Sequence, residues 1–546
     1  MRFGGCPMLT HDFRRQTMRR FHSYGPADSE QHFCVQRKEL IRQCMDYLIG
    51  DLEKGGHYFT LWGARQTGKT WLIRQAANLI KNLCSERFMA AYLSLQGIAM
   101  EEEEPVGHFL RYVPRLFLDG FDMEINALQT WEDFTALFQR KTSPFDRPVI
   151  LFIDEIDVLP KSVIIRLMSV FRDIFLKKES YLLHGLAIIG VKALQGSDSQ
   201  TGDPFNIQRS LHVPNLTKTE VREIFEQYQD QSSQKIDPIV TDAVFEVTRG
   251  QPGLVSWFGE LLTEKFNPGR KLIIRKRDWD KTYLHACSTE WNPTVSNLIE
   301  KANGEYRSYI IELFGRSDIV FSIRADWCNY LYLNGIIDYD LTVDTKGRET
   351  SVSRFSSPYI QQAIYDALTY NLIGDRTPIL ALDPLDDLTD VFDKPFLNVP
   401  GIVRRYQQYL KRLKAKELDF WKSRSEPQDL RFNEVIGHFH LYSWLKSAIG
   451  RYCDITPRLP AGNGKVDLHI RSDSKEGIIE VVRFTDSRQI RHSAKQAAEY
   501  AAQMGLKAVT LAFFVPVEDE GILQKLSAQG RIANVQVTIC AIGICG

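Results

Sequence analysis

The chain has 546 residues, which is too long for one hydrophobic core and predicts about three or four domains. Lys plus Arg and Asp plus Glu each number 68, so the balanced charge excludes a globally basic nucleic-acid-binding protein and leaves only local charged surfaces. Apolar residues make up 44% and charged residues 25%, which is ordinary for a soluble globular protein. No apolar run approaches the ~18 residues that suggest a membrane span.

The nine cysteines are scattered, odd in number and without C-x-x-C spacing. This pattern favours reduced thiols in a cytoplasmic protein over a disulfide framework or a zinc site. Residues 1–20 contain five arginines and one aspartate but no apolar stretch. A transit peptide is one interpretation of such a segment, but we expect a disordered N-terminus.

The strongest motif is a glycine-rich loop between an expected strand and an expected helix. Residues 58–62 are apolar and β-rich, residues 63–70 read GARQTGKT, and an apolar helical stripe begins at Trp71. The loop fits G-x-x-x-x-G-K-[ST], in which backbone N–H groups surround phosphates at a helix N-terminus. We expect Lys69 to reach the β- and γ-phosphates and the Thr70 hydroxyl to bind Mg²⁺. The expected nucleotide-binding residues here are Gly63, Ala64, Arg65, Gln66, Thr67, Gly68, Lys69, Thr70 and Trp71.

A second motif, PVILFIDEID over residues 148–157, joins an apolar run to two carboxylates. The apolar run predicts a parallel strand that is buried on both faces, and ligands bind at the carboxyl ends of such strands. We therefore expect Asp154 to emerge beside the glycine-rich loop and to hold Mg²⁺. Glu155 is expected to orient and deprotonate the attacking water, and so to act with Lys69 in catalysis. Residues 21–213 thus predict an α/β nucleotide-binding core.

Residues 214–270 predict a small helical lid. Thr217-Lys218-Thr219-Glu220 has the pattern of a capping box at a helix start. A second helix over residues 237–248 stops at Arg249-Gly250-Gln251-Pro252, and a third helix follows over residues 254–266.

The segments GARQTGKT, LFIDEID, DPFNIQRSLHVPNLTKTEVREIFEQY and TRGQPGLVSWFGELL resemble the AAA-like ATPases of the STAND type, signal-transduction ATPases with numerous domains. The resemblance covers residues 20–270. It implies a P-loop ATPase that binds ATP and Mg²⁺ and acts as a molecular switch. It also implies that Pro252, in the Gly-Gln-Pro signature of the lid, lies near the nucleotide and reports its state.

Residues 271–370 have a different pattern. An aromatic helix within residues 321–337 ends at Asn334-Gly335, and residues 336–339 and 351–355 alternate like two strands. Helix, glycine stop and hairpin suggest a winged-helix-like domain, which also fits the family. A winged helix binds DNA in some proteins. Because the basic residues here are few, we favour the alternative of a structural relay; they are Lys346, Arg348 and Arg354.

Residues 371–425 predict a linker and a connector helix. Residues 371–400 are rich in Asp and Pro, and residues 403–421 form a basic helical pattern. This basic helix presents either a solvated face or a phosphate-binding surface, and we favour the solvated face. Its basic residues are Arg404, Arg405, Lys411, Arg412, Lys414 and Lys416.

Residues 426–546 predict a further α/β domain that begins with an apolar helical stripe. Strands follow over residues 464–470, 477–482 and 509–515, and a helix between the last two carries Gln496 and Tyr500 on one face. This order resembles the PD-(D/E)xK nuclease fold, in the branch with a Gln-x-x-x-Tyr helix. The resemblance implies two metal-binding carboxylates, an early-helix glutamate and a substrate-side pair, which are Asp467 and Glu480, Glu434, and Gln496 and Tyr500.

One residue departs from that nuclease pattern. The lysine expected two residues after Glu480 is Val482. Lys465 lies two residues before Asp467, on the same strand face, and is a candidate substitute. Three interpretations stay open: an active Mg²⁺-dependent nuclease, a degenerate domain that only binds DNA or protein, and a chance resemblance.

The sequence as a whole predicts an ATP-binding, ATP-hydrolysing switch. Its expected parts are an α/β P-loop core, a helical lid, a winged-helix-like module and a C-terminal PD-(D/E)xK-like domain. The alternatives are a DNA nuclease gated by the ATPase and a signalling scaffold with protein partners. Expected partners are ATP, DNA through the two terminal modules, and protein partners or a second copy of the chain, with no membrane.

Overall fold

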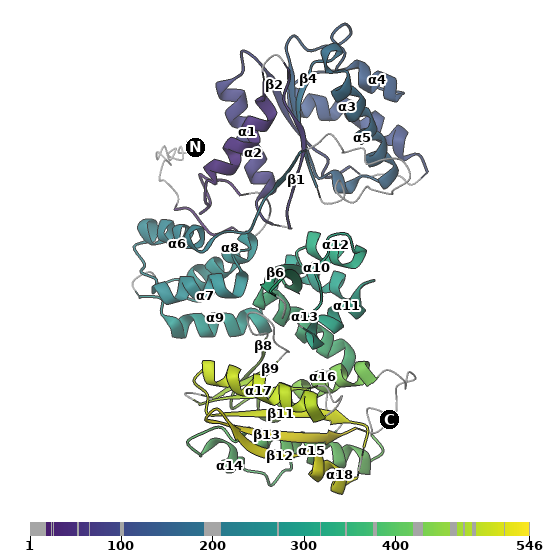
Figure 1. Cartoon of the computed structure of the whole chain (residues 1–546). Helices are drawn as coiled ribbons and strands as arrows, with labels where there is room; N and C mark the ends of the chain where they lie inside the picture. Colours follow the sequence, from purple (N-terminus) through teal and green to yellow (C-terminus); the bar gives the residue numbers. More distant parts are fainter. Residues whose placement is uncertain are drawn as a thin grey trace, which may run out of the picture. The chain divides into compact units, whose positions relative to one another are not determined.

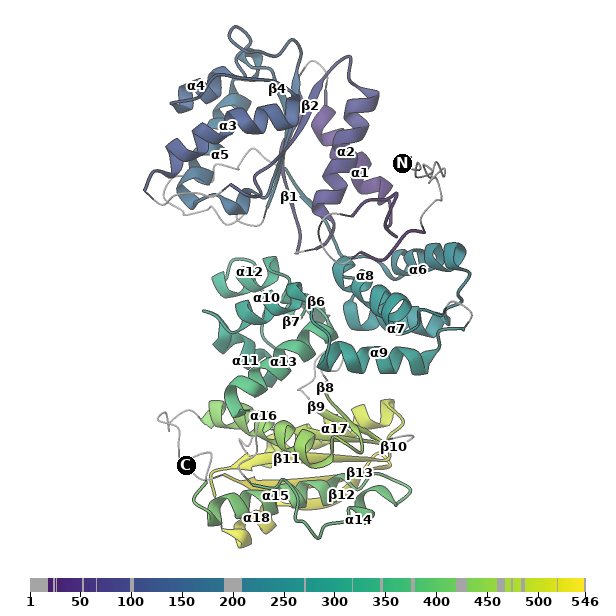
Figure 2. The same cartoon turned by 180° about the vertical axis from the view of Figure 1, so that it is seen from behind.

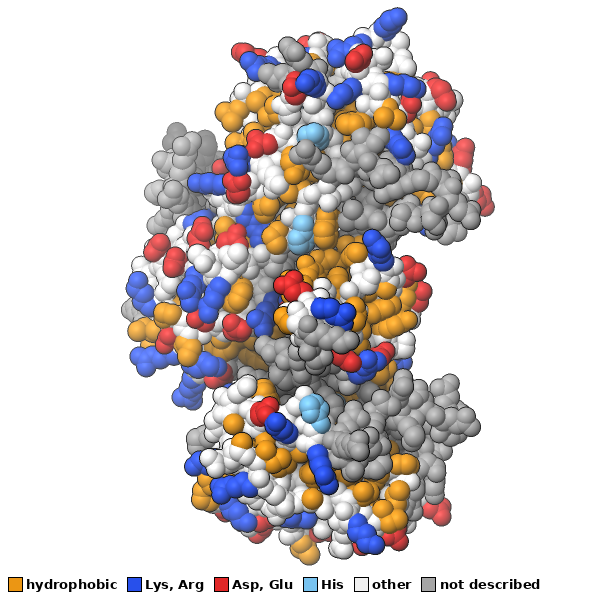
Figure 3. Space-filling model, viewed as in Figure 1, with side chains coloured by type: hydrophobic (Ala, Val, Ile, Leu, Met, Phe, Trp, Pro, Cys, Tyr) orange, Lys and Arg blue, Asp and Glu red, His pale blue; other side chains and the backbone are white. Residues whose placement is uncertain are grey.

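The structure is a computed structural model. It describes residues 18–22, 25, 27–51, 54–64, 66–98, 103–190, 209–269, 272–316, 318–343, 347–374, 379–418, 430–458, 467–472, 475–482, 487–517 and 519–544. The chain divides into two compact units, Met1–Ala286 and Cys287–Gly546 (Figures 1 and 2). No helix among the described residues is long and apolar enough to cross a membrane. On the face seen in Figure 3, charged side chains of both signs are interspersed, as the balanced composition predicts.

The first unit is built on a five-stranded parallel sheet in the order β2-β3-β4-β1-β5. The strands are β1 (Tyr58–Trp62), β2 (Met89–Ser94), β3 (Val149–Asp154), β4 (Leu183–Ile189) and β5 (Arg209–His212). All six residues of β3 are buried, as the apolar run predicts for a central parallel strand. Because every strand runs the same way, the carboxyl ends of β1 and β3 lie at the same edge of the sheet.

Helices cover both faces of this sheet (Figure 1). One core cluster joins α1 (Lys38–Ile49) and α2 (Lys69–Leu83) to alternate strand residues such as Ile150 and Phe152. The other cluster joins α3 (Pro105–Phe121), α4 (Trp131–Ala136) and α5 (Lys161–Leu176) to the intervening residues, such as Leu151 and Ile153. Adjacent strand residues therefore pack into different cores, as the period of two in a strand requires.

The predicted lid is helical. It contains α6 (Lys218–Ser232), α7 (Pro238–Thr248) and α8 (Pro252–Glu260), which continues as a π-helical turn, η4 (Leu261–Lys265). Thr217 and Glu220 form the predicted capping box at the start of α6. The following helix, α9 (Lys276–Ser288), runs across the boundary between the two units.

The second unit begins with helices and one hairpin. The helices are α10 (Pro293–Ala302), α11 (Arg307–Gly315), α12 (Asp326–Leu333) and α13 (Pro358–Ile373), and the strands are β6 (Ile337–Val343) and β7 (Glu349–Phe355). The predicted glycine stop after α12 is present, since Gly335 has a φ of 78°. Arg354 on β7 forms ion pairs with Asp338 and Asp340 on β6, at 3.0 and 2.7 Å. The two aspartates of the hairpin thus neutralise the charge of Arg354, one of the basic residues that would favour DNA binding.

The C-terminal sheet has six strands in the order β12-β13-β11-β10-β9-β8. It mixes antiparallel pairs with the parallel pairs β10–β11 and β11–β13. The strands are β8 (Asp454–Arg458), β9 (Asp467–Ser472), β10 (Lys475–Val481), β11 (Ala508–Val515), β12 (Ala528–Ile532) and β13 (Val535–Gly543). α17 (Ser487–Gln503) packs on the face that carries Phe513, whereas Phe514 points to the other face and contacts Tyr406 of α15.

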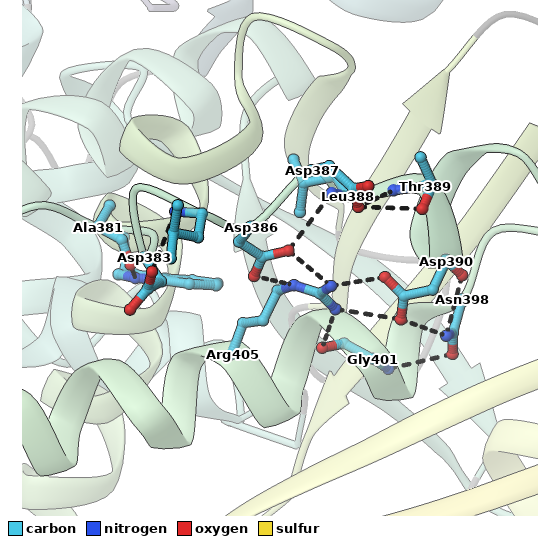
Figure 4. Close-up of polar contacts among 12 residues, drawn as sticks. Ala381, Asp383, Asp386, Asp387, Leu388, Thr389, Asp390, Asn398, Gly401 and Arg405 are labelled. Atoms are coloured by element: carbon cyan, nitrogen blue, oxygen red, sulfur yellow. Dashed lines mark hydrogen bonds and ion pairs between the residues drawn. The ribbon is translucent and has the colours of Figure 1, made fainter.

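α15 (Val399–Ala415) packs against this sheet, next to β10, β11 and β13. The sequence predicted a connector here, but the apolar side of the helix belongs to the C-terminal fold. The Asp-rich segment before α15 is fixed to this helix by ion pairs. Arg405 binds Asp386 and Asp390 at 2.5 Å each (Figure 4). The hydrogen bonds from Arg405 hold the pKa of both carboxyls below the ordinary value. Asp390 lies in a short helix, α14 (Thr389–Phe392), and a last helix, α18 (Glu520–Leu526), precedes β12.

α16 (Leu430–Ile449) joins the hairpin module to the C-terminal sheet. Tyr365 of α13 hydrogen-bonds His438 Nδ1 at 2.6 Å, and Tyr406 of α15 hydrogen-bonds His440 Nδ1 at 2.7 Å. Both histidines are 5% exposed. Two buried polar pairs on one helix therefore tie both neighbours to it.

Candidate functional site

The glycine-rich loop lies between the end of β1 and the start of α2, as the motif predicts. Gly68 precedes the helix with a φ of 88°, and Gln66 also has a left-handed backbone, with a φ of 59°. A Cβ on Gly63 would lie 2.6 Å from the Val213 carbonyl oxygen, so that position accepts only glycine. Thr67 closes the turn, because its hydroxyl donates to the Ala64 oxygen at 3.0 Å. Arg65 lies outside the described residues.

The Lys69 ammonium lies against this loop. Its Nζ donates to the carbonyl oxygens of Gly63 and Ala64, at 2.8 and 2.7 Å. Lys69 is also the first residue of the 15-residue helix α2, whose N-terminus carries partial positive charge. The cation and the helix end together favour an anion at the loop.

Asp154 lies at the carboxyl end of β3 and is 2% exposed. Its Oδ2 accepts hydrogen bonds from the Thr70 hydroxyl at 2.8 Å and from the Tyr92 hydroxyl at 2.7 Å. Its Oδ1 accepts the Glu155 amide at 2.9 Å. Three donors thus fix the carboxylate beside the first turn of α2, where the sequence predicted it.

Tyr92 is a residue that the sequence analysis missed. It lies on β2, opposite Phe152 of β3, and the Arg74 guanidinium lies 5.0 Å from its ring centroid. Burial, followed by the charge of Asp154, raises the pKa of Tyr92, so the phenol stays protonated and donates a hydrogen bond to the carboxylate. The only signal in the sequence is a polar-tipped aromatic near the carboxyl end of an expected strand.

Glu155 is exposed and has a left-handed backbone, with φ 60° and ψ 35°. Such a conformation is uncommon for a residue with a side chain. It ends β3 sharply and starts the short helix η1 (Ile156–Val158). The carboxylate is therefore at the rim of the site, and its role in activating water stays a prediction.

The Gln66 side chain of the loop contacts the lid. A Cβ on Gly253 would lie 2.0 Å from Oε1 of Gln66, so the Gln66 side chain packs directly on the first turn of α8. Pro252 is at the start of that turn, and Gln251 caps it by accepting the Leu254 amide at 2.5 Å. The Gly-Gln-Pro signature is thus adjacent to a loop residue.

Trp71 differs from the other loop residues because it points into the core. It is 7% exposed and belongs to the cluster beneath α1 and α2. Its indole Nε1 is buried without a hydrogen-bond partner among the described residues. A packing role explains the side chain better than contact with a ligand.

The C-terminal candidates are only partly described. Asp467 and Glu480 are opposite each other on the antiparallel strands β9 and β10, and Glu480 is 8% exposed. Gln496 is exposed on α17, and Tyr500 on the same helix is partly buried against its core. Lys465 and the side chains of Glu434 and Asp467 lie outside the described residues.

Val482 is 1% exposed within the apolar cluster between α17 and the sheet. The position of the expected lysine is therefore part of the core. The described residues contain no group of three or more His, Cys, Asp or Glu side chains placed to hold a metal ion. His469, which the sequence analysis did not single out, is on the sheet face of Glu480 and lies 3.5 Å from Glu476.

The chain matches no protein-family model and no curated protein. Among solved structures, it is similar to ORC1 of Aeropyrum pernix in complex with DNA, at 14% identity over 61% of this chain and 92% of that chain, with a TM-score of 0.32. The Walker-type ATPase of Pyrococcus abyssi has 14% identity over 63% and 99% of the two chains, with a TM-score of 0.40. The RuvB Holliday junction branch migration motor of Thermotoga maritima has 16% identity over 60% and 94%, with a TM-score of 0.32. Similarity at this level does not assign the chain to a family.

Proposed function

We propose that this protein is an ATP-binding and ATP-hydrolysing molecular switch of the AAA-like STAND type. One observation carries the proposal: the hydrogen bond of 2.8 Å between the Thr70 hydroxyl and the Asp154 carboxylate. It joins the end of the phosphate-loop motif to the carboxylate that the motif requires, across 84 residues of sequence. A chance match to the loop pattern has no reason to place these two groups together.

The residues at this position fit Mg²⁺. Thr70 and Asp154 supply hard oxygen atoms, and Mg²⁺ sites beside phosphates use one or two carboxylates together with water and phosphate oxygens. Mg²⁺ would neutralise charge that develops on the phosphates. Tyr92 and the Glu155 amide orient the carboxylate for this role.

The chain's own groups would divide the remaining work. Lys69 and the backbone amides of the loop would bind the β- and γ-phosphates. Glu155, exposed beside Asp154, would orient and deprotonate the attacking water. Gln66 packs on Gly253, so a change in the loop on nucleotide binding would shift α8 and Pro252.

The C-terminal domain is a candidate for a second, nuclease-like function. The register pair Asp467–Glu480 supports a nuclease-like arrangement with two carboxylates, whereas the buried Val482 counts against an active site. We propose a nuclease-like module that binds and does not cut, under the control of the ATPase. The paired Arg354 likewise favours a relay over DNA binding for the winged-helix-like module.

Nucleotide titration and turnover test the main proposal. Lys69→Ala should abolish ATP binding, whereas Lys81→Ala, which removes an exposed lysine from the last turn of the same helix, should not. Glu155→Gln should keep ATP binding and lose turnover by about 100-fold or more, the usual scale for a lost general base. Wild-type protein without affinity for ATP would overturn the proposal.

A further inference from the structure

A groove of about 710 Å³ opens on the C-terminal domain, far along the chain from the nucleotide loop. It is bounded by α15, α18, β12 and β13, all within the second unit. Sites for small molecules are typically ~300–1,000 Å³ and combine an apolar lining with a few convergent polar groups. The groove has this size, and its lining combines apolar residues with about as many polar and charged ones.

The basic residues of α15 divide into two sets. Arg405 is paired with Asp386 and Asp390, and Arg412 donates to the carbonyl oxygens of Leu380 and Ala381, at 3.0 Å each. These two arginines hold the preceding segment in place. The second set lines the groove and consists of Arg404, Lys411 and Lys414.

The second set follows one side of the helix. Positions 404, 411 and 414 are seven and three residues apart, which places them on one helical face over roughly 15 Å of helix. Lys411 contacts Glu520 of α18, across the groove. Arg404 is exposed and forms no ion pair with any described residue. The described lining thus contains three cationic side chains, Arg404, Lys411 and Lys414, and one carboxylate, Glu520.

The floor of the groove is neutral and largely apolar. Thr538, Cys540 and Ile542 are alternate residues of β13 and face away from the α17 cluster that holds Val537 and Ala541. Burial raises the pKa of Cys540 to about 11, so its thiol is uncharged at neutral pH. Leu410 of α15 and Leu523 of α18 add apolar walls.

We propose that this groove binds a phosphorylated organic molecule of nucleotide size, with its phosphate on Arg404 and Lys414 and its body on the β13 floor. Arginine and lysine together are the usual protein partners of phosphate. The described lining contains no aromatic side chain, so the groove lacks the stacking platforms with which proteins bind single-stranded nucleic acid. The site is separate from the ATP site and would give the C-terminal domain its own ligand.

Calorimetry on the full chain tests this proposal in a Lys69→Ala background, which removes the main phosphate contact of the ATP site. The probes are inorganic pyrophosphate and adenosine 5′-monophosphate at low salt. Arg404→Ala with Lys414→Ala should weaken both probes at least tenfold. Lys394→Ala with Lys416→Ala removes the same charge from exposed positions outside the groove and should leave both affinities within twofold. Gln524→Trp, which fills the groove and keeps its cations, should weaken the monophosphate more than pyrophosphate.

Three outcomes would overturn the proposal. Neither probe binds in the Lys69→Ala background, or the two double variants lose affinity equally, which would indicate only a general effect of charge. In the third outcome, a single-stranded DNA oligonucleotide binds through Arg404 and Lys414 while both small probes do not. That result would replace the small ligand with a nucleic acid.

Discussion

The Thr70 hydroxyl donates a hydrogen bond of 2.8 Å to the Asp154 carboxylate, although the two residues belong to different strand–helix units. We expect Thr70→Ala to reduce the Mg²⁺-dependent part of ATP affinity about tenfold, because one oxygen ligand is lost. Thr70→Ser keeps the hydroxyl and should behave like the wild type. ATP titrations with Mg²⁺ and with EDTA measure this difference. A Thr70→Ala protein whose affinity responds to Mg²⁺ like the wild type would contradict the assigned ligand.

The contact between Gln66 and Gly253 predicts coupling between loop and lid. Gly253→Ala should weaken ATP binding about fivefold, since its methyl group would displace Oε1 of Gln66. Gln66→Ala removes the obstacle, so adding Gly253→Ala to it should cost little. A double-mutant cycle on ATP affinity should give a coupling of about 0.5 kcal/mol or more. Gly269→Ala, where an added Cβ meets nothing within 4 Å, is the control. Additive effects would show that the contact does not link the two parts.

Alanine variants of Arg405 and of its neighbour Arg404 provide a matched test of stability. Arg405→Ala should lower the local free energy of unfolding by about 2 kcal/mol, because it removes charged hydrogen bonds to Asp386 and Asp390. Hydrogen exchange in Thr389–Phe392 should accelerate accordingly. Arg404→Ala should leave exchange in α14 unchanged. Equal exchange in both variants would argue that the carboxylates hold the segment in another way.

The same ion pairs predict an acid-sensitive segment. The folded pKa of Asp386 and of Asp390 is lowered, so their contribution is complete above the unfolded value of about 3.9 and is lost as the pH falls through the folded value. The hydrogen-exchange rate of wild-type α14, corrected for the intrinsic pH dependence of exchange, should therefore be constant down to about pH 5. Below about pH 4 the helix should open. The Arg405→Ala variant should show much less of this dependence. Opening at neutral pH in the wild type would contradict the prediction.

The packing of Val482 makes a prediction about the nuclease-like domain. Val482→Lys should cost about 3 kcal/mol or more, because an uncompensated charge enters the apolar cluster beneath α17. It should not create Mg²⁺-dependent cleavage of DNA. Val482→Ile tests the same position without charge and should stay folded. Cleavage by the wild type that disappears in Asp467→Ala would instead establish an active nuclease.

The glycine-rich loop and its neighbouring carboxylate were largely predictable from the sequence because their signals are local. GARQTGKT fixes the loop, and an apolar run that ends in Asp154 fixes the carboxylate. Tyr92 and the Gln66–Gly253 contact were not predictable, since each depends on how separate elements pack. No periodicity in the sequence of β2 or α8 specifies such a contact.

α15 shows a different reason for failure. Its many basic residues predicted a solvated connector, but Ile402, Tyr406, Tyr409 and Leu413 form a buried stripe among them. Arg405 and Arg412 add to the number of basic residues in this helix, but their side chains bind the preceding segment and stabilise the fold. Composition alone could not separate these structural arginines from Arg404, because that distinction is made by the partners on a distant segment.

The two tyrosine–histidine pairs of α16 have a mechanical consequence. Because Tyr365–His438 and Tyr406–His440 are both buried, sliding α13 or α15 along α16 would break a hydrogen bond that water cannot replace. The hairpin module, which includes α13, and the C-terminal sheet, on which α15 packs, should therefore move together as one rigid body. We therefore expect a displacement of α13 to reach the C-terminal sheet without separating α15, which lines the groove, from α16.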